Sequence, residues 1–286
     1  MSYPKPRFFY WFLMPSVITA LGLTLAMLAI MQYSVRAYVP GSLDVGGFTL
    51  DNFVTLLRPL YARAFIETVL LSFYTALFTL LIGFPLAYAM VRAKRSWCRS
   101  LILIVAITPL FLGEVVRTYS WIIVLGNNGF LNSVLMGIGL IDRPIRLMFT
   151  QLGVVIALVH VTLPIMVLML AAGISHIDRA YERAAISLGA GPIRTFLNVT
   201  LPLSIPGILA GTMTSFAWTF SAFATPQLIG GGRVNTISTL VYQLGFSSLN
   251  FPLAASISVA GLALTVLVLW ITKRMMSSLE RLGGQP

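Results

Sequence analysis

The sequence predicts an all-α polytopic membrane protein with six transmembrane helices. The first observation behind this prediction is that 58% of the 286 residues are hydrophobic and only 9% are charged. Soluble domains usually carry about 25% charged residues, so a soluble fold of this length could not hide so much apolar surface. The second is that the apolar residues gather in stretches of about 20, the length that spans a bilayer. We expect residues 1–286 to form a single transmembrane domain.

Six stretches reach that length, and charges or turn-forming residues separate them. They cover residues 11–33, 65–91, 101–125, 149–174, 205–228 and 253–272. The first stretch follows Lys5 and Arg7. It is longer than the roughly 7–15-residue core of a cleavable signal peptide, so we expect a retained membrane helix.

The basic residues between the stretches predict the orientation of the chain. If the N-terminus lies inside, most of the 19 Lys and Arg residues fall on the cytoplasmic side, with a cluster at 92–95. Cytoplasmic loops are enriched in Lys and Arg, so both termini are expected in the cytoplasm. The bases punctuate the apolar stretches and form no patch with aromatic residues, which argues against nucleic-acid binding.

Two of the outer loops are long enough to hold structure of their own. A run from Asp51 is typical of a short amphipathic helix at the membrane interface. Residues 131–141 are apolar but too short to span a bilayer, and Asp142 and Pro144 follow them. We expect a re-entrant or interfacial helix there.

The sequence contains no recognisable catalytic motif, phosphate-binding loop or metal-ligand spacing. Its single cysteine, Cys98, cannot form an intrachain disulfide. We therefore expect neither enzymatic activity nor a bound metal or cofactor. His160 falls in the middle of the fourth stretch, where a hydrogen-bonded core histidine is expected, although a proton-relay role stays open.

Glu114 and Arg117 are charges within the third stretch, and their i, i+3 spacing makes them neighbours on one helix face. One interpretation is a self-neutralising pair near the outer end of this helix. The other is that Glu114 faces a water-filled path and meets a cationic solute. Trp121, Trp218 and Phe223 could line the same path or belong to the interfacial aromatic belt.

Residues 178–202 form a short polar segment between two long apolar stretches. Asp178 can cap a helix, Gly189 permits a turn, and Pro192 favours a second helix start. The pattern is compatible with two short helices at an angle and also with a plain loop. We call these residues the coupling segment.

The coupling segment resembles the EAA loop of ABC-importer permeases, which reads E-A-A, three residues, G, nine residues, I, one residue, L-P. The residues that match at this spacing are Ala184, Ala185, Gly189, Leu201 and Pro202. Val199 replaces the Ile of the pattern, and Arg183 stands where the family has Glu, with Glu182 one position earlier.

Other stretches resemble the spermidine/putrescine-type branch of these permeases in particular. They are Gly83 to Tyr88, Val116 to Trp121, Leu163 to Leu168 and Phe223 to Gly231. The resemblance covers about residues 60–276 and implies the type I ABC importer permease fold in a bacterial inner membrane. The same branch includes importers for opines and organophosphonates, so the branch alone does not identify the solute.

The resemblance also implies partners and residue roles. The partners are a second related permease, two cytoplasmic ATPases that use ATP and Mg²⁺, and an external solute-binding protein. The residues implied in ATPase coupling are Glu182, Arg183, Ala184, Ala185, Gly189, Leu201 and Pro202. A polyamine or a similar small organic cation is the expected solute. The alternative function is a stand-alone secondary transporter or channel that uses Glu114 and His160.

Overall fold

The computed structural model describes residues 6–42 and 44–283. The chain divides into two compact units. Unit 1 comprises Met1–Ala62 and Leu240–Ala263, and unit 2 comprises Arg63–Thr239 and Leu264–Pro286. The expectation of one transmembrane domain stays a prediction.

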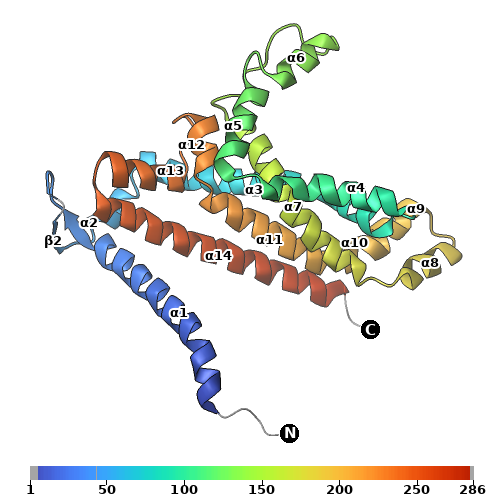
Figure 1. Ribbon diagram of the computed structural model, residues 1–286, viewed down its shortest axis with the longest axis horizontal. Coiled ribbons are helices and arrows are strands. Elements are labelled where there is room, and N and C mark those ends of the chain that lie inside the picture. The colour runs from blue at the N-terminus through green and yellow to red at the C-terminus, as the bar shows by residue number, and fades with distance from the viewer. Residues whose placement is uncertain (1–5, 43, 284–286) are drawn as a thin grey trace. The chain divides into compact units, whose positions relative to one another are not determined.

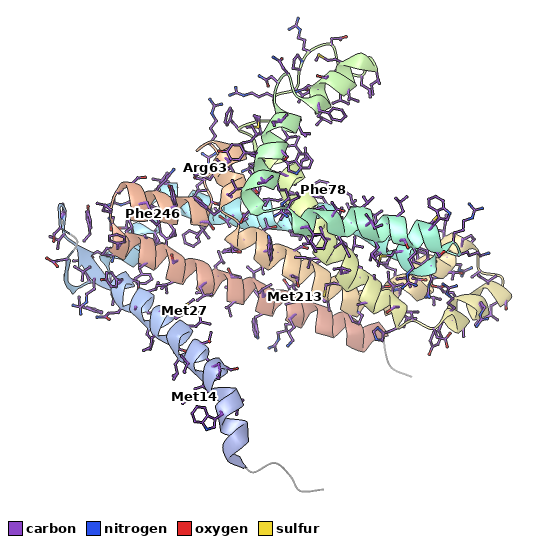
Figure 2. All side chains as sticks on the ribbon, viewed as in Figure 1. Met14, Met27, Arg63, Phe78, Met213 and Phe246 are labelled. Carbon is purple, nitrogen blue, oxygen red and sulfur yellow. The ribbon has the colours of Figure 1, made fainter. Side chains whose placement is uncertain are left out.

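Unit 1 contains a long apolar helix followed by a small hairpin. Its own elements are α1 (Pro6–Ser34), β1 (Arg36–Tyr38), β2 (Val45–Phe48), α2 (Asp51–Thr55) and the π-helix η3 (Gln243–Ser247). The two strands are antiparallel, and buried Asn52 of α2 donates hydrogen bonds to the carbonyls of Ser34 and Arg36. Figure 2 shows the side chains of Met14 and Met27 projecting from α1, and both are about half exposed.

Unit 2 is almost entirely helical. Its elements are α4 (Ser96–Ile107), the 3₁₀ helix η1 (Thr108–Phe111), α5 (Glu114–Leu125), α6 (Phe130–Gly137), α7 (Gln151–Ser175), α8 (Arg179–Ser187), α9 (Pro192–Thr195), the π-helix η2 (Phe196–Thr200), α10 (Leu201–Leu203), α11 (Ile205–Ser221) and α12 (Ala224–Gly230). Three further helices have residues in both units, and they are α3 (Pro59–Arg92), α13 (Ile237–Tyr242) and α14 (Phe251–Gly283).

The core of unit 2 is built around α7. This helix is apolar on all sides, which is typical of a helix surrounded by others. One buried cluster joins its first half to Leu71 of α3 and Ile229 of α12, and a second joins its last half to Phe84 of α3. The buried hydroxyls of Thr79 and Thr162 lie 2.9 Å apart and link α3 to α7.

The close approach of α7 and α11 depends on glycine. A Cβ atom added to Gly173 would lie 2.9 Å from the Cα of Gly207, and one added to Gly207 would lie 3.2 Å from the Met169 carbonyl. Small residues allow helix backbones to approach closely in a membrane. The two helices therefore run side by side in unit 2 (Figure 1).

Four helices of the described chain are long and apolar enough to cross a membrane, and the number rises to six if each of two bent pairs is one span. The four are Leu13–Ser34, Pro59–Arg92, Gln151–Ser175 and Phe251–Arg274. The bent pairs are Ser96–Phe111 with Glu114–Gly137, at 109°, and Pro192–Leu203 with Ile205–Ser221, at 66°. This is the expected all-α polytopic membrane architecture, apart from the short hairpin.

The prediction of one continuous third helix over 101–125 is wrong. The helical path breaks at Leu112 and Gly113, whose ψ angles of 131° and 146° are extended. In an unbroken helix the Pro109 carbonyl would accept from the Gly113 N–H. Here it accepts a long 3.4 Å bond from the Leu112 N–H and a 2.8 Å bond from the Arg117 Nη1 instead.

The predicted fifth helix over 205–228 also ends too late. Helix α11 stops at Ser221, and Ala222 is extended with a ψ of 131°. Pro226 explains this position, because a proline ring clashes with the carbonyl four residues earlier and offers it no N–H. Helix α12 then starts at Ala224, which leaves Pro226 in its first turn.

The short helices expected in two loops are present. Helix α2 begins at Asp51, as predicted, and α6 covers most of the expected 131–141 helix. Buried Asn132 of α6 donates to the carbonyls of Gly126 and Ile145, which ties the segments before and after α6 to this helix. The placement of α2 and α6 at a membrane interface stays a prediction.

Candidate functional site

The coupling segment folds as two short helices joined by a turn. Helix α8 is capped by Asp178, whose Oδ1 accepts from the Ala180 N–H at 2.8 Å. Its other end closes with bonds from the Gly189 N–H to the Ile186 carbonyl and from the Ala190 N–H to the Ala185 carbonyl. This is a Schellman motif, and the φ of +84° at Gly189 is the left-handed conformation that it requires.

Pro192 is the first residue of α9, at the start position where proline is favoured. The prediction of two helices is confirmed, and the plain-loop alternative is wrong.

The turn exposes apolar side chains. Leu188 is 89% exposed and Ile193 76%. We call these two residues the turn surface. Large apolar groups gathered on a polar segment are typical of a protein-interaction site.

The residues implied in coupling lie at different depths in the same segment. Arg183, Ala184, Gly189 and Pro202 are exposed, whereas Glu182, Ala185 and Leu201 are half-buried. Arg183 stands at the position of the family's Glu, and its side chain is exposed. Their role in coupling stays a prediction.

Glu182 makes contacts that the sequence did not indicate. Its Oε1 lies 3.0 Å from the Nη2 of Arg92, the last residue of α3, and the two side chains are only 14% and 12% exposed. The same oxygen accepts from the Thr200 hydroxyl at 3.1 Å. Arg92 and Glu182 are 90 positions apart, so no local spacing signals the pair. The sequence shows only that Arg92 and Glu182 each lie near the edge of a polar segment.

The second region of interest is the break before α5. Arg117 is 6% exposed, and no salt bridge joins it to Glu114 among the described residues. The guanidinium binds the Pro109 carbonyl, and its Nε has no hydrogen-bond partner within the described chain. Arg117 and Glu114 therefore form no direct salt bridge in the described chain, although their charges still attract each other. Glu114 is exposed in the first turn of α5, where the helix dipole favours a carboxylate.

Trp121 and His160 interact directly. The Trp121 Nε1 donates to the His160 Nδ1 at 3.1 Å, and the two rings meet edge to face. Since Nδ1 accepts this bond, the proton of a neutral imidazole lies on Nε2. The prediction of a hydrogen-bonded core histidine is confirmed, and the contact joins α5 to α7.

The other aromatic residues assigned to a solute path lie near the end of α11. Trp218 is 49% exposed, and Phe223 stands at the break between α11 and α12 and is half-buried. The structure brings Trp121 to His160, and within the described residues no hydrogen bond or ring contact joins Trp121 to Trp218. A shared path stays a prediction.

Unit 1 contains a cavity of about 640 Å³, and its lining differs from the polar surroundings of the two regions described above. Its lining includes Ile30, Tyr33, Val241, Phe246 and Phe251, and none of the described residues that line it is charged. Such a lining offers nothing that would select a charged solute, although it suits hydrocarbon.

Comparison with known proteins gives the family. The family described as "Binding-protein-dependent transport system inner membrane component" matches residues 79–281. The spermidine/putrescine transport system permease PotB of Escherichia coli K12 is 32% identical over 233 residues, which cover 80% of this chain and 84% of that protein. The molybdenum permease ModB of Haemophilus influenzae is 31% identical over 225 residues, which cover 75% and 96%.

Solved structures support the fold. A bacterial alginate ABC transporter, solved in complex with an alginate-bound periplasmic protein, contains a chain that matches with a TM-score of 0.80 and 20% identity, over 96% of this chain and 95% of that one. The MetNI methionine ABC transporter matches with a TM-score of 0.57 and 16% identity, over 82% and 98%. Identity this low carries the fold alone.

Together with the helical spans and the EAA-like coupling segment, these matches identify the class of the protein. It is a multi-pass inner membrane protein with the type I importer permease fold, and it belongs to the non-enzymatic membrane components of such systems. The chain is a member of the binding-protein-dependent transport system inner membrane component family, an ABC-importer permease similar to the spermidine/putrescine permeases.

Proposed function

We propose that this permease forms half of the translocation path of an ATP-driven importer for a small organic cation, most simply a polyamine. A second, related permease supplies the other half, two cytoplasmic ATPases bind ATP and Mg²⁺, and an external binding protein delivers the solute. The chain itself holds no cofactor. The observation that carries the proposal is the geometry of the coupling segment, since it presents an apolar turn surface on a helix pair of defined shape.

The turn surface is suited to dock in a cleft of the ATPase. Leu188 and Ile193 flank the rigid Gly189 turn and would be desolvated on binding. When ATP closes the ATPase dimer, the docked helices move with it and switch the path between inward-open and outward-open states. Basic residues near this segment and at 92–95 support a cytoplasmic location for it and for both termini.

Two observations support a cationic solute. The first is the similarity to PotB over four-fifths of the chain. The second is that Arg117 is held by the Pro109 carbonyl, which leaves the exposed Glu114 carboxylate without a salt bridge in the described chain. In this proposal the Glu114 carboxylate attracts the cation by charge, and the exposed ring of Trp218 on the same path adds cation–π attraction.

The test is purification of the tagged chain from its native membrane in mild detergent, followed by mass spectrometry and by uptake of labelled spermidine into vesicles. We expect a P-loop ATPase and a second six-span permease to co-purify, and uptake to require ATP. Repeated recovery of the chain alone would overturn the importer proposal in favour of the stand-alone transporter with Glu114 and His160. An ATPase partner with no polyamine uptake would overturn only the solute class.

A further inference from the structure

Arg92 and Glu182 form a low-exposure ion pair at the junction between a membrane helix and the coupling segment. The Glu182 Oε1 lies 3.0 Å from the Arg92 Nη2 and 3.2 Å from its Nε. With side chains only 12% and 14% exposed, the pair is less screened by salt than a surface pair. Removal of either partner leaves the other charge poorly solvated, which strongly disfavours this arrangement of α3 and α8.

Further hydrogen bonds connect this pair to two other segments, and one more bond joins α8 to α3. The Glu182 Oε1 also accepts from the hydroxyl of Thr200, a fully buried residue of η2. The Arg92 Nη2 donates to the Ile177 carbonyl at the end of α7, at 3.1 Å. Arg179 of α8 returns the contact by donating to the Val91 carbonyl of α3, at 3.2 Å.

These contacts restrict how α8 can move. Its first turn is tied to the end of α3 through Arg92 and Arg179, and to η2 through Thr200. Helix η2 lies directly before α10, and the helical chain then bends by 66° into α11. A displacement of α8 would therefore carry the ends of α3 and α11 with it, while the turn surface stays clear of the contacts.

We propose that Arg92, Glu182 and Thr200 form a transmission clamp, which passes the movement of the docked α8 to α3 and α11. They act as positioning residues and need not touch the ATPase. The inference rests on the proposed ATP-driven function. It also gives Glu182 a role inside the chain, whereas Arg183 occupies the family position that faces outward.

The clamp is testable in the purified complex with its ATPase by measuring a distance between two spin labels. The native Cys98 is replaced by Ser, and labels are placed on Ser187→Cys, an exposed α8 position outside the coupling residues, and on Lys94→Cys beyond the end of α3. Distance distributions are recorded without nucleotide and after trapping with ATP and vanadate. The variants are Arg92→Gln, Glu182→Gln and the charge swap Arg92→Glu with Glu182→Arg. Arg95→Gln, an exposed neighbour, is the matched control for loss of a positive charge.

We expect one narrow distribution in both nucleotide states for the unmodified pair and for Arg95→Gln. Each single variant should at least double the width of the distribution while the ATPase still co-purifies, and the charge swap should narrow it again. Spermidine uptake should fall in the single variants by roughly 5- to 150-fold, the range of typical coupling between sites.

Three results would overturn the clamp. They are single variants that keep the narrow distribution, a charge swap that fails to narrow it, and loss of the ATPase from the single variants, which would make the pair part of the docking surface. The distance measurement needs no knowledge of the solute, so a wrong solute class leaves this test intact. A complex that contains no ATPase would instead overturn the proposed function itself.

Discussion

Arg92 and Arg117 both donate to a backbone carbonyl where the helical path is interrupted, but only Arg92 also meets a carboxylate. Arg92 binds the Ile177 carbonyl and pairs with Glu182, which is 90 positions away. Arg117 binds the Pro109 carbonyl and does not pair with Glu114, three positions away, in the described chain. The pair with favourable spacing is absent, and the pair with no local signal is formed.

The difference follows from what surrounds each arginine. Arg117 is buried beside a bend of 109°, and the bend leaves the Pro109 carbonyl with only a weak bond to satisfy it. A buried carbonyl without a strong donor is costly, so it competes successfully for the guanidinium. Glu114 stays outside, where water and the helix dipole stabilise its charge. The carbonyl left open at the helix break therefore determines the hydrogen-bond partner of Arg117, and the i, i+3 spacing to Glu114 does not.

The largest effect is expected at the Gly189 turn, on which the position of the Glu182 helix depends. A Cβ there would meet no neighbouring atom within 4 Å, so a substitution tests only the left-handed backbone. That conformation costs residues with a Cβ roughly 1–2 kcal/mol, and more when the side chain is β-branched. Gly189→Val should abolish uptake and ATPase co-purification, both measured on membranes with equal permease content. Gly189→Asn, which tolerates this conformation, should retain both. Full activity of the valine variant would remove the turn from the docking model.

Replacement of Arg117 should have the next largest effect, mainly on stability. Arg117→Ala removes the 2.8 Å bond to the Pro109 carbonyl, and a lost hydrogen bond to a charged group costs about 1.5–3 kcal/mol. We expect a lower thermal midpoint of unfolding in detergent, partly recovered in Arg117→Lys. An alanine variant as stable as the parent protein would show that the bend does not depend on this arginine.

Glu114→Gln sharpens the comparison because the exposed carboxylate should matter for transport and not for stability. Exposed substitutions usually change stability by less than about 0.5 kcal/mol. We expect an unchanged thermal midpoint and a several-fold decrease in spermidine uptake, with Asp142→Asn as the control for neutralising another exposed acid. Loss of assembly in the Glu114 variant would support a structural role instead.

The smallest effect is expected at the contact between Trp121 and His160. Trp121→Phe retains an aromatic ring and removes the hydrogen bond to the His160 Nδ1, which is worth about 0.5–1.5 kcal/mol. A double-mutant cycle with His160→Ala, read from thermal unfolding, should give a coupling energy in that range. A coupling energy of zero would mean that the two rings are merely adjacent.

Much of the fold could be predicted because it rests on local rules. Asp178, Gly189 and Pro192 predicted the ends of α8 and the start of α9, since caps and turns depend on a few consecutive residues. The third helix was predicted as continuous and the fifth was predicted too long, because hydrophobicity reports burial in lipid and does not report a break. Pro226 did contain a usable signal, as its ring position identifies Ala222 as the residue that must leave the helix.

The sequence by itself determined that the chain is a membrane protein and where its apolar stretches lie, and it indicated the cap, turn and proline of one polar segment. These properties depend on composition and on neighbours along the chain. The tertiary structure alone decided that Glu182 meets Arg92 and that Arg117 turns to Pro109. The reason is that distance and burial in space determine the partner of a charge. The packing of α3, α7 and α8 sets both for Glu182, and the break between η1 and α5 sets both for Arg117.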